Sequence, residues 1–430
     1  MKHYKEFIFL SYSFDAASKT AVFQYSFDEE VFFEESYVFD FEFVDYKKSE
    51  LDRALQDLFF MAGVSYYKMY PSDTISIRQG LMDLKDASFF SEVYQKGLGE
   101  FFYTNNLDPT TVIPFEPNVD EIVPSATQED DFSQGLLIGI GGGKDSLITA
   151  EFLRDLPSVA TWSLGHRKQL QPLINRIGLP HLWVDRKLDP NIKVLNQQGA
   201  RNGHIPISAI FATCGAVVSV LSGKSDIVVS NEYSANEPNL IFRNTPINHQ
   251  YSKSQDFEEL YQDLLRRHFN GLLDYYSFLR PLSELHIAEV FVKRGFLDKY
   301  IHDFSSCNRA FTQGSTALSW CGACSKCAFT YLALAPFAQQ DQLDEIFKKD
   351  LLGISGLVNT YQELLGIEGN KPLDCVGEIK EAQSAMKIMQ DKRDDLDKFE
   401  LSLPPDYDYR QLQPDSMPED MRGILLSELA

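Results

Sequence analysis

The chain has 430 residues, which is enough for two or three domains with cores of their own, and 44% of them are hydrophobic, as in an ordinary soluble globular protein. Its 40 Lys and Arg residues against 62 Asp and Glu residues give a formal net charge of −22, which disfavours binding to the phosphate backbone of a nucleic acid. The first apolar run is too short for a secretory signal, and the uncharged stretch 205–223 carries four hydroxyl side chains, so we expect a cytoplasmic protein with no nucleic-acid or membrane partner.

Aromatic and polar residues alternate near the N-terminus, with the period of two that a β-strand with one buried face requires. Two such runs, 20–27 and 31–43, are separated by the acidic residues 28–30. This arrangement predicts an antiparallel hairpin. The chain holds 32 Phe and 20 Tyr, and we expect the aromatic residues of this part to pack in a core rather than to form a binding surface.

A helix is predicted over 49–60, where apolar residues recur with helical spacing and Ser49 stands where a capping residue is expected. The segment 105–131 is rich in Pro, Asp and Thr and has no regular period, which is typical of a linker. We therefore expect a first, aromatic-rich domain of α+β type over residues 1–125.

From residue 136 onward, strand and helix patterns alternate, which predicts an α/β domain with a parallel sheet flanked by helices over residues 126–340. The predicted strands are 136–140, 159–164, 181–184 and 226–230, and the predicted helices between them are 147–154, 168–177 and 207–221. Ligands of such sheets bind beyond the carboxyl ends of the strands. Residues 341–430 form an acidic helical region with a tail, to which the sequence assigns no chemistry.

A glycine-rich turn joins the first strand of this domain to its first helix. Glycines let backbone N–H groups converge in conformations closed to other residues, and a helix N-terminus adds unpaired donors, so the turn predicts an anion site. The spacing does not match a Walker A loop or a dinucleotide-binding loop. The residues expected to bind the anion are Gly141, Gly142, Gly143, Lys144, Asp145 and Ser146.

Four cysteines have the spacing C-x13-C-x2-C-x2-C, namely Cys307, Cys321, Cys324 and Cys327. Four thiolates so placed predict a metal site, either a tetrahedral Zn²⁺ or an iron–sulfur cluster, in a reducing compartment. The alternative is a thiol-rich turn before a helix over 328–335. Of the other two cysteines, Cys214 falls in an apolar helix and Cys375 carries no motif.

Two polar segments are further candidates for the site. Asn231 and Glu232 follow a predicted strand and are candidates for contacts with Mg²⁺ or ribose, unless they only cap the next helix. In the loop 248–254, His249 is a candidate proton carrier and Lys253 a candidate clamp for a phosphate or carboxylate. A single His is more often structural than catalytic.

The turn 141–146 resembles the S-G-G-x-D-S pyrophosphate loop of the PP-loop ATP pyrophosphatase superfamily, with Gly141 in place of the first serine. The resemblance implies a PP-loop (HUP-like) fold and an enzyme that cuts ATP between its α- and β-phosphates. In such enzymes the loop holds pyrophosphate, and a carboxylate like Asp145 helps to place Mg²⁺.

Together with this loop, the segments 230–236, 248–254, 306–309 and 320–327 resemble the MurL family, the UDP-N-acetylmuramoyl-L-alanyl-L-glutamate epimerases. The resemblance implies an isomerase of peptidoglycan precursor synthesis with ATP and a UDP-MurNAc-dipeptide as substrates. The terminal L-Glu would be activated as an acyl-adenylate and inverted to D-Glu, with release of AMP and pyrophosphate. It further implies that the loop and Asp145 serve ATP and Mg²⁺, and that His249 or Lys253 lies near the α-carbon.

Two other classes of protein fit the same motifs. A 7-cyano-7-deazaguanine synthase-like or tRNA-thiolating PP-loop enzyme also combines the loop with clustered cysteines, but the acidic charge and the large aromatic N-terminal part disfavour it. The substituted first serine also allows an ATP-binding module without turnover. Release of pyrophosphate distinguishes an enzyme from such a module.

Overall fold

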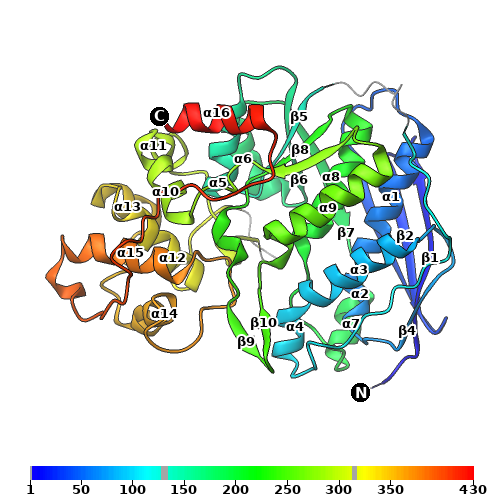
Figure 1. Cartoon of the computed structure of the whole chain (residues 1–430), viewed down its shortest axis with the longest axis horizontal. Coiled ribbons are helices and arrows are strands. Elements are labelled where there is room, and N and C mark those ends of the chain that lie inside the picture. The colour runs from blue at the N-terminus through cyan, green and yellow to red at the C-terminus, as the bar shows by residue number, and fades with distance from the viewer. Residues whose placement is uncertain (1, 127–133, 312–316) are drawn as a thin grey trace.

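Nine strands form one central sheet in the computed structural model, which describes residues 2–126, 134–311 and 317–430 (Figure 1). The last residues of the expected linker, 127–131, lie outside these ranges. The order of the strands across the sheet is β11, β8, β5, β6, β7, β3, β2, β1, β4. Their bounds are β1 Glu6–Asp15, β2 Thr20–Phe27, β3 Val31–Asp40, β4 Thr74–Ile77, β5 Leu136–Gly139, β6 Val159–Leu164, β7 His181–Lys187, β8 Asp226–Val229 and β11 Asp274–Ser277.

The five strands from β11 to β7 are parallel, as the alternating strand and helix patterns predict. The chain runs from β5 outward through β6 to β7 and then returns to place β8 on the opposite side of β5. At such a switch point the loops after the two neighbouring strands diverge and leave a crevice at the carboxyl edge of the sheet. The loop after β5 is the glycine turn, so the fold itself points to this crevice as the site.

The N-terminal strands continue the same sheet. The predicted hairpin is confirmed as β2 and β3, which pair antiparallel, and β1 pairs with β2 on its other side. Residues Ser36 to Asp40 of β3 pair antiparallel with Lys187 to Trp183 of β7, and this pairing joins the N-terminal strands to the parallel ones. The domain limits near residues 125 and 340 remain predictions. A separate ribbon, β9 Leu240–Phe242 with β10 Thr245–Ile247, lies outside the main sheet.

Helices cover the sheet and extend from it in the C-terminal part, where α12 to α15 lie at the end of the molecule opposite β1 to β4 (Figure 1). The first helices are α1 Lys48–Ala62, α2 Val64–Tyr67, α3 Leu84–Gly97 and α4 Gly99–Thr104. The central ones are α5 Lys144–Leu153, α6 Arg167–Ile177, α7 Asn191–Gln197, α8 Ile207–Ser222, α9 Gln255–Phe269, α10 Glu284–Lys293, α11 Phe296–Tyr300 and α12 Ser325–Leu334. The last are α13 Gln340–Phe347, α14 Val358–Leu364, α15 Ile379–Gln390 and α16 Glu419–Leu429.

Two hydrophobic cores occupy the two faces of the sheet. Because successive side chains of a strand point to opposite faces, Leu137 belongs to one core while Leu136 and Ile138 belong to the other. The first core contains the N-terminal aromatic residues together with α1, α8 and α9, as expected for packing rather than binding. The second core contains α5, α6, α10 and the C-terminal helices. The stretch 205–223 is largely the buried helix α8, and no helix among the described residues is long and apolar enough to cross a membrane.

The expected role of Ser49 as a helix cap is wrong. Helix α1 begins at Lys48, and no side chain caps its first turn. The Ser49 hydroxyl instead donates to the carbonyl of Ser125, 3.2 Å away. The hydroxyl therefore bonds to a residue distant in the sequence and not, as the local pattern predicted, to the backbone of the helix.

A buried charged group connects α9 to the N-terminal helices. The imidazole of His268 contacts the carboxylate of Asp57 in α1 at 2.9 Å and that of Asp86 in α3 at 3.0 Å. Burial lowers the pKa of His268, but the two carboxylates outweigh burial and raise it to about 9. This imidazolium therefore stabilises the contact between three helices at neutral pH.

Candidate active site

The glycine turn contains a backbone conformation that only glycine adopts easily. Gly142 has a φ of +94°, in the left-handed region, and its carbonyl accepts a hydrogen bond from the N–H of Ser305 at 2.9 Å. A Cβ at Gly142 would lie 3.2 Å from Cδ2 of Leu170 and 3.2 Å from the Ser305 carbonyl oxygen, whereas one at Gly141 would meet open space. Helix α5 begins directly after Gly143, so its free N–H groups face the same opening.

A cavity of about 330 Å³ lies beside this turn, at the carboxyl edge of β5 and β8. It brings together residues that the sequence predicts from separate segments: the glycine turn, the end of β8 and the loop 248–254. It also includes one residue of α12 and one of the C-terminal region. Its wall includes Gly141, Gly143, Asp145, Ser146, Ser230, Asn231, Lys253, Ser306, Lys326 and Cys375.

The side chain of Lys144 links the turn to α10 through an ion pair with Glu284. Its ammonium contacts the carboxylate of Asp145 at 2.6 Å and forms an ion pair with the buried carboxylate of Glu284. Burial lowers the pKa of Lys144, but these two carboxylates raise it more, so the ammonium stays charged. Glu284 also faces the ammonium of Lys326 at 3.4 Å. The pair therefore fixes the turn to α10 and orients Asp145 at the rim of the cavity.

Glu232 is buried behind the cavity, and its pKa is raised to about 7 by burial and by the nearby charge of Glu284. The guanidinium of Arg280 donates to the carbonyl of Glu232 and to that of Lys253, both at 2.7 Å, and contacts Glu258 at the same distance. Arg280 is fully buried. It therefore holds the end of β8 and the loop 248–254 in fixed positions relative to each other.

His249 is placed between two partners. Its Nδ1 is hydrogen-bonded to the carboxylate of Glu100 in α4, and its ring is also hydrogen-bonded to the thiol of Cys375. Burial lowers the pKa of His249, but the hydrogen bonds to Cys375 and Glu100 raise it to about 10, so the ring is an imidazolium at neutral pH. The neighbouring ring of His204, 4.3 Å away between centroids, stays neutral because burial lowers its pKa to about 3.

Cys375, which belongs to no motif in the sequence, lies on the wall of this cavity. The ammonium of Lys253 is 3.4 Å from its sulfur. Burial raises the pKa of the thiol, but the charge of Lys253 and the hydrogen bond and charge of His249 outweigh burial and lower it to about 6. No local pattern could have identified Cys375, because its partners are 122 and 126 residues away in the sequence.

The four predicted metal ligands converge. The sulfurs of Cys307 and Cys324 are 3.9 Å apart, those of Cys321 and Cys327 are 3.7 Å apart, and all four lie within 4.8 Å of one another. Zn–S bonds of about 2.3 Å in a tetrahedron place the sulfurs about 3.8 Å apart. The spacing therefore fits one tetrahedral ion, whereas an iron–sulfur cubane needs room for several irons and sulfides between the thiolates.

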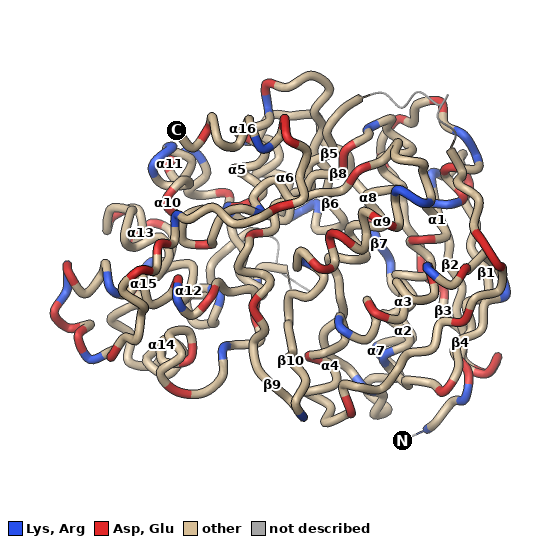
Figure 2. Tube along the Cα trace, in the orientation of Figure 1, with Lys and Arg blue, Asp and Glu red and all other residues tan. Residues whose placement is uncertain are grey.

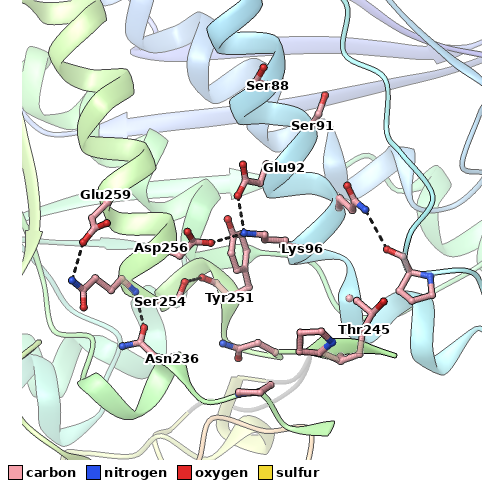
Figure 3. Close-up of a pocket in the computed structure, with 18 of the residues that line it drawn as sticks. Ser88, Ser91, Glu92, Lys96, Asn236, Thr245, Tyr251, Ser254, Asp256 and Glu259 are labelled. Atoms are coloured by element: carbon pink, nitrogen blue, oxygen red, sulfur yellow. Dashed lines mark hydrogen bonds and ion pairs between the residues drawn. The ribbon is translucent and has the colours of Figure 1, made fainter. Parts of the chain in front are cut away.

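A larger cavity of about 1170 Å³ opens on the other side of the loop 248–254 (Figure 3). Its wall carries the carboxylates of Glu92, Asp256 and Glu259. The ammonium of Lys96 points between Glu92 and Asp256 and contacts each at 2.7 Å. The charge of this lysine is therefore already balanced. The smaller cavity, with Lys253 and Lys326 on its wall, is the better place for an anionic substrate.

Over the described trace, Lys and Arg residues are interspersed with Asp and Glu residues in all parts of the view (Figure 2). Of the two lysines on the wall of the smaller cavity, Lys326 is buried and Lys253 is half-buried. Lys253 and Lys326 are each within reach of several carboxylates or thiols, and burial strengthens these interactions. Positive charge is therefore present at this cavity within an otherwise acidic protein.

Two family models match the chain. The model described as the MurL N-terminal domain matches residues 1–278, and the model described as the MurL C-terminal domain matches residues 303–402. The first match covers the glycine turn, the end of β8 and the loop 248–254. The second covers the four cysteines, Lys326 and Cys375.

Three curated relatives carry the name UDP-N-acetyl-alpha-D-muramoyl-L-alanyl-L-glutamate epimerase. The protein of Salinispora tropica is 37% identical over 391 residues, which are 89% of this chain and 84% of the relative. That of Xanthomonas oryzae pv. oryzae is 38% identical over 378 residues, 84% of this chain and 81% of the relative. That of a Micromonospora species is 36% identical over 394 residues, 90% of this chain and 87% of the relative.

Proposed function

Because this chain belongs to the MurL family, we propose that it inverts the α-carbon of the terminal L-glutamate in UDP-MurNAc-L-Ala-L-Glu. We propose further that ATP drives the reaction and leaves as AMP and pyrophosphate. The three relatives are named for the epimerisation. The observation that supports the coupling to ATP is the convergence of a glycine-rich anion turn, the buried Lys326 and the half-buried Lys253 on one cavity.

The chemistry explains why an epimerase would use ATP. The α-proton of an ionised glutamate is hard to remove, because deprotonation would create a second negative charge beside the carboxylate. Transfer of AMP to that carboxylate neutralises it and makes the α-proton far more acidic. A base can then remove the proton, reprotonation on the other face gives the D-configuration, and water releases AMP by attack on the carbonyl carbon.

The residues divide between the two halves of the reaction. The N–H groups of the glycine turn and of the first turn of α5 would hold the phosphates. Asp145 and Asn231 on the cavity wall would hold Mg²⁺, with the carboxyl group of Glu232 buried behind them. Mg²⁺ would neutralise charge on the phosphates of ATP. Lys253, on the wall of the same cavity, would bind the glutamate and, with His249, control the proton at its α-carbon.

The four thiolates of Cys307, Cys321, Cys324 and Cys327 would hold a single Zn²⁺ with no part in the chemistry. The segment that carries them also supplies Lys326 to the cavity wall. Its 3₁₀ turn and the start of α12 are hydrogen-bonded to Asp374, next to Cys375. The ion would therefore fix one side of the active site.

The proposal is tested by incubating the protein with ATP, Mg²⁺ and UDP-MurNAc-L-Ala-L-Glu and analysing the configuration of glutamate after acid hydrolysis. D-Glu formed together with AMP and pyrophosphate supports the proposal. Asp145→Asn should abolish AMP formation and leave the melting temperature within a few degrees. Full turnover by a folded Asp145→Asn variant would refute the assignment of the turn, and pyrophosphate without D-Glu would refute the substrate.

A further inference from the structure

Cys375 is held rigidly on the wall of the cavity. It lies between α14 and α15, and its N–H donates to the carboxylate of Asp374 at 2.9 Å. The same carboxylate accepts hydrogen bonds from the side chains of Asn308 at 2.9 Å and Ser325 at 2.8 Å. The segment with the four cysteines therefore fixes the backbone that presents this thiol to the glycine turn.

The thiol is surrounded by cations. Lys253 is 3.4 Å from the sulfur, His249 is hydrogen-bonded to it, and the ammonium of Lys326 adds a third positive charge. The Nδ1 of His249 is hydrogen-bonded to the carboxylate of Glu100, so this carboxylate orients the imidazole. A nucleophile or base next to an imidazole that is oriented by a carboxylate is the arrangement of an activated thiol.

A comparison with Cys214 shows that burial alone does not produce this state. Cys214 is buried among apolar side chains of α8, and burial raises the pKa of its thiol. Cys375 has three cations around it, and its pKa falls to about 6. At neutral pH Cys375 is therefore a thiolate, with a proton affinity near that of an efficient general base.

We propose that the thiolate of Cys375 removes the α-proton of the activated glutamate, an inference that rests on the proposed epimerisation. The C–H bond breaks, an S–H bond forms, and the electron pair moves into the neutralised carboxyl group as an enolate. A proton from water is delivered to the opposite face of the α-carbon. The thiol then returns its proton to water, so no net proton is consumed. His249 and Glu100 are positioning residues for the thiolate.

The test uses the full-length protein and the variants Cys375→Ala and Cys375→Ser in D₂O, with ATP, Mg²⁺ and UDP-MurNAc-L-Ala-L-Glu. Three products are measured: AMP, deuterium at the α-carbon, and D-Glu. We expect both variants to keep AMP formation within about threefold, because hydrolysis of the activated intermediate returns L-Glu. Deuterium and D-Glu should fall by at least about a hundredfold. Cys214→Ala is the matched control and should behave as the wild type.

Two outcomes would overturn this assignment alone: D-Glu formation within about threefold of wild type in a folded variant, or AMP and D-Glu falling by the same factor. A wild-type protein that makes no D-Glu would overturn the epimerisation, and this inference with it.

If the variants do not fold, chemical modification of Cys375 in the wild-type protein tests the proposal. Methyl methanethiosulfonate at pH 6.5 should modify Cys375, as located by mass spectrometry, and stop D-Glu formation while AMP formation continues. Dithiothreitol should restore activity. Modified Cys375 with unchanged D-Glu formation would overturn the proposal.

Discussion

Replacement of Lys253 by Met tests whether its charge maintains the thiolate. At 3.4 Å from the sulfur, the ammonium stabilises the thiolate by about 5 kcal/mol if the effective dielectric constant is about 20. Water that enters the space left by the ammonium will restore part of this stabilisation. We therefore take the net loss as about half of it, which corresponds to a rise of about 2 in the pKa of Cys375. The pKa of Cys375 would then move from about 6 to about 8. At pH 7 the thiolate fraction would fall from about nine tenths to about one tenth.

The assay is the rate at which iodoacetamide alkylates Cys375 as a function of pH, followed by peptide mass spectrometry without any substrate. The midpoint of the rate profile should rise by about 2 pH units in Lys253→Met, and D-Glu formation at pH 7 should fall at least about tenfold. Lys253→Arg should keep most of the low midpoint. Lys224→Met is the control for loss of a positive charge. Lys224 precedes β8, at the end of that strand opposite to the cavity. An unchanged midpoint in Lys253→Met would refute the reasoning.

Three further predictions concern the turn, the metal and stability. Gly142→Ala should raise the KM for ATP at least about tenfold, because a Cβ at this positive φ would be both strained and crowded. Gly423→Ala in α16, where a Cβ meets open space, is the control and should leave the KM unchanged. Equal KM values for the two variants would contradict the role of the turn. Cys324→Ser should reduce bound zinc, measured by atomic emission, from one ion per chain to well below one and lower the melting temperature. His268 has a raised pKa, so its contribution is complete below about pH 6.5 and is lost as the pH rises through about 9. Urea unfolding should show a loss of about 3 kcal/mol over this range that His268→Asn lacks, and identical pH profiles would contradict the buried imidazolium.

Local periodicity was enough to predict most elements of the sheet. The hairpin of β2 and β3, strand β6 and helix α8 agree with the predicted limits within one residue or a few. In each case the pattern follows from burial of one face or of both faces, which neighbouring residues determine. The sequence did not indicate the antiparallel pairing of β3 with β7, because pairing between strands about 150 residues apart leaves no local signal.

The same distinction holds for the site. The glycine turn and the four cysteines are local motifs, and the structure brings the turn together with Asn231 and Lys253 in one cavity. Cys375, Glu100 and Lys326 were missed because each becomes a site residue only through distant partners. Buried charge pairs of this kind are set by the tertiary fold, which also explains why Lys144 is bound to Glu284, 140 residues away.

The activation of the substrate through an acyl-adenylate is the central claim, and the transfer of oxygen tests it most directly. UDP-MurNAc-L-Ala-L-Glu carrying ¹⁸O at both oxygens of the α-carboxylate of glutamate would be converted in ordinary water with ATP and Mg²⁺, and the AMP would be analysed by mass spectrometry. The account predicts one ¹⁸O atom in each AMP, because hydrolysis at the carbonyl carbon leaves the bridging oxygen on phosphorus. D-Glu formed with unlabelled AMP, or with no AMP, would contradict it.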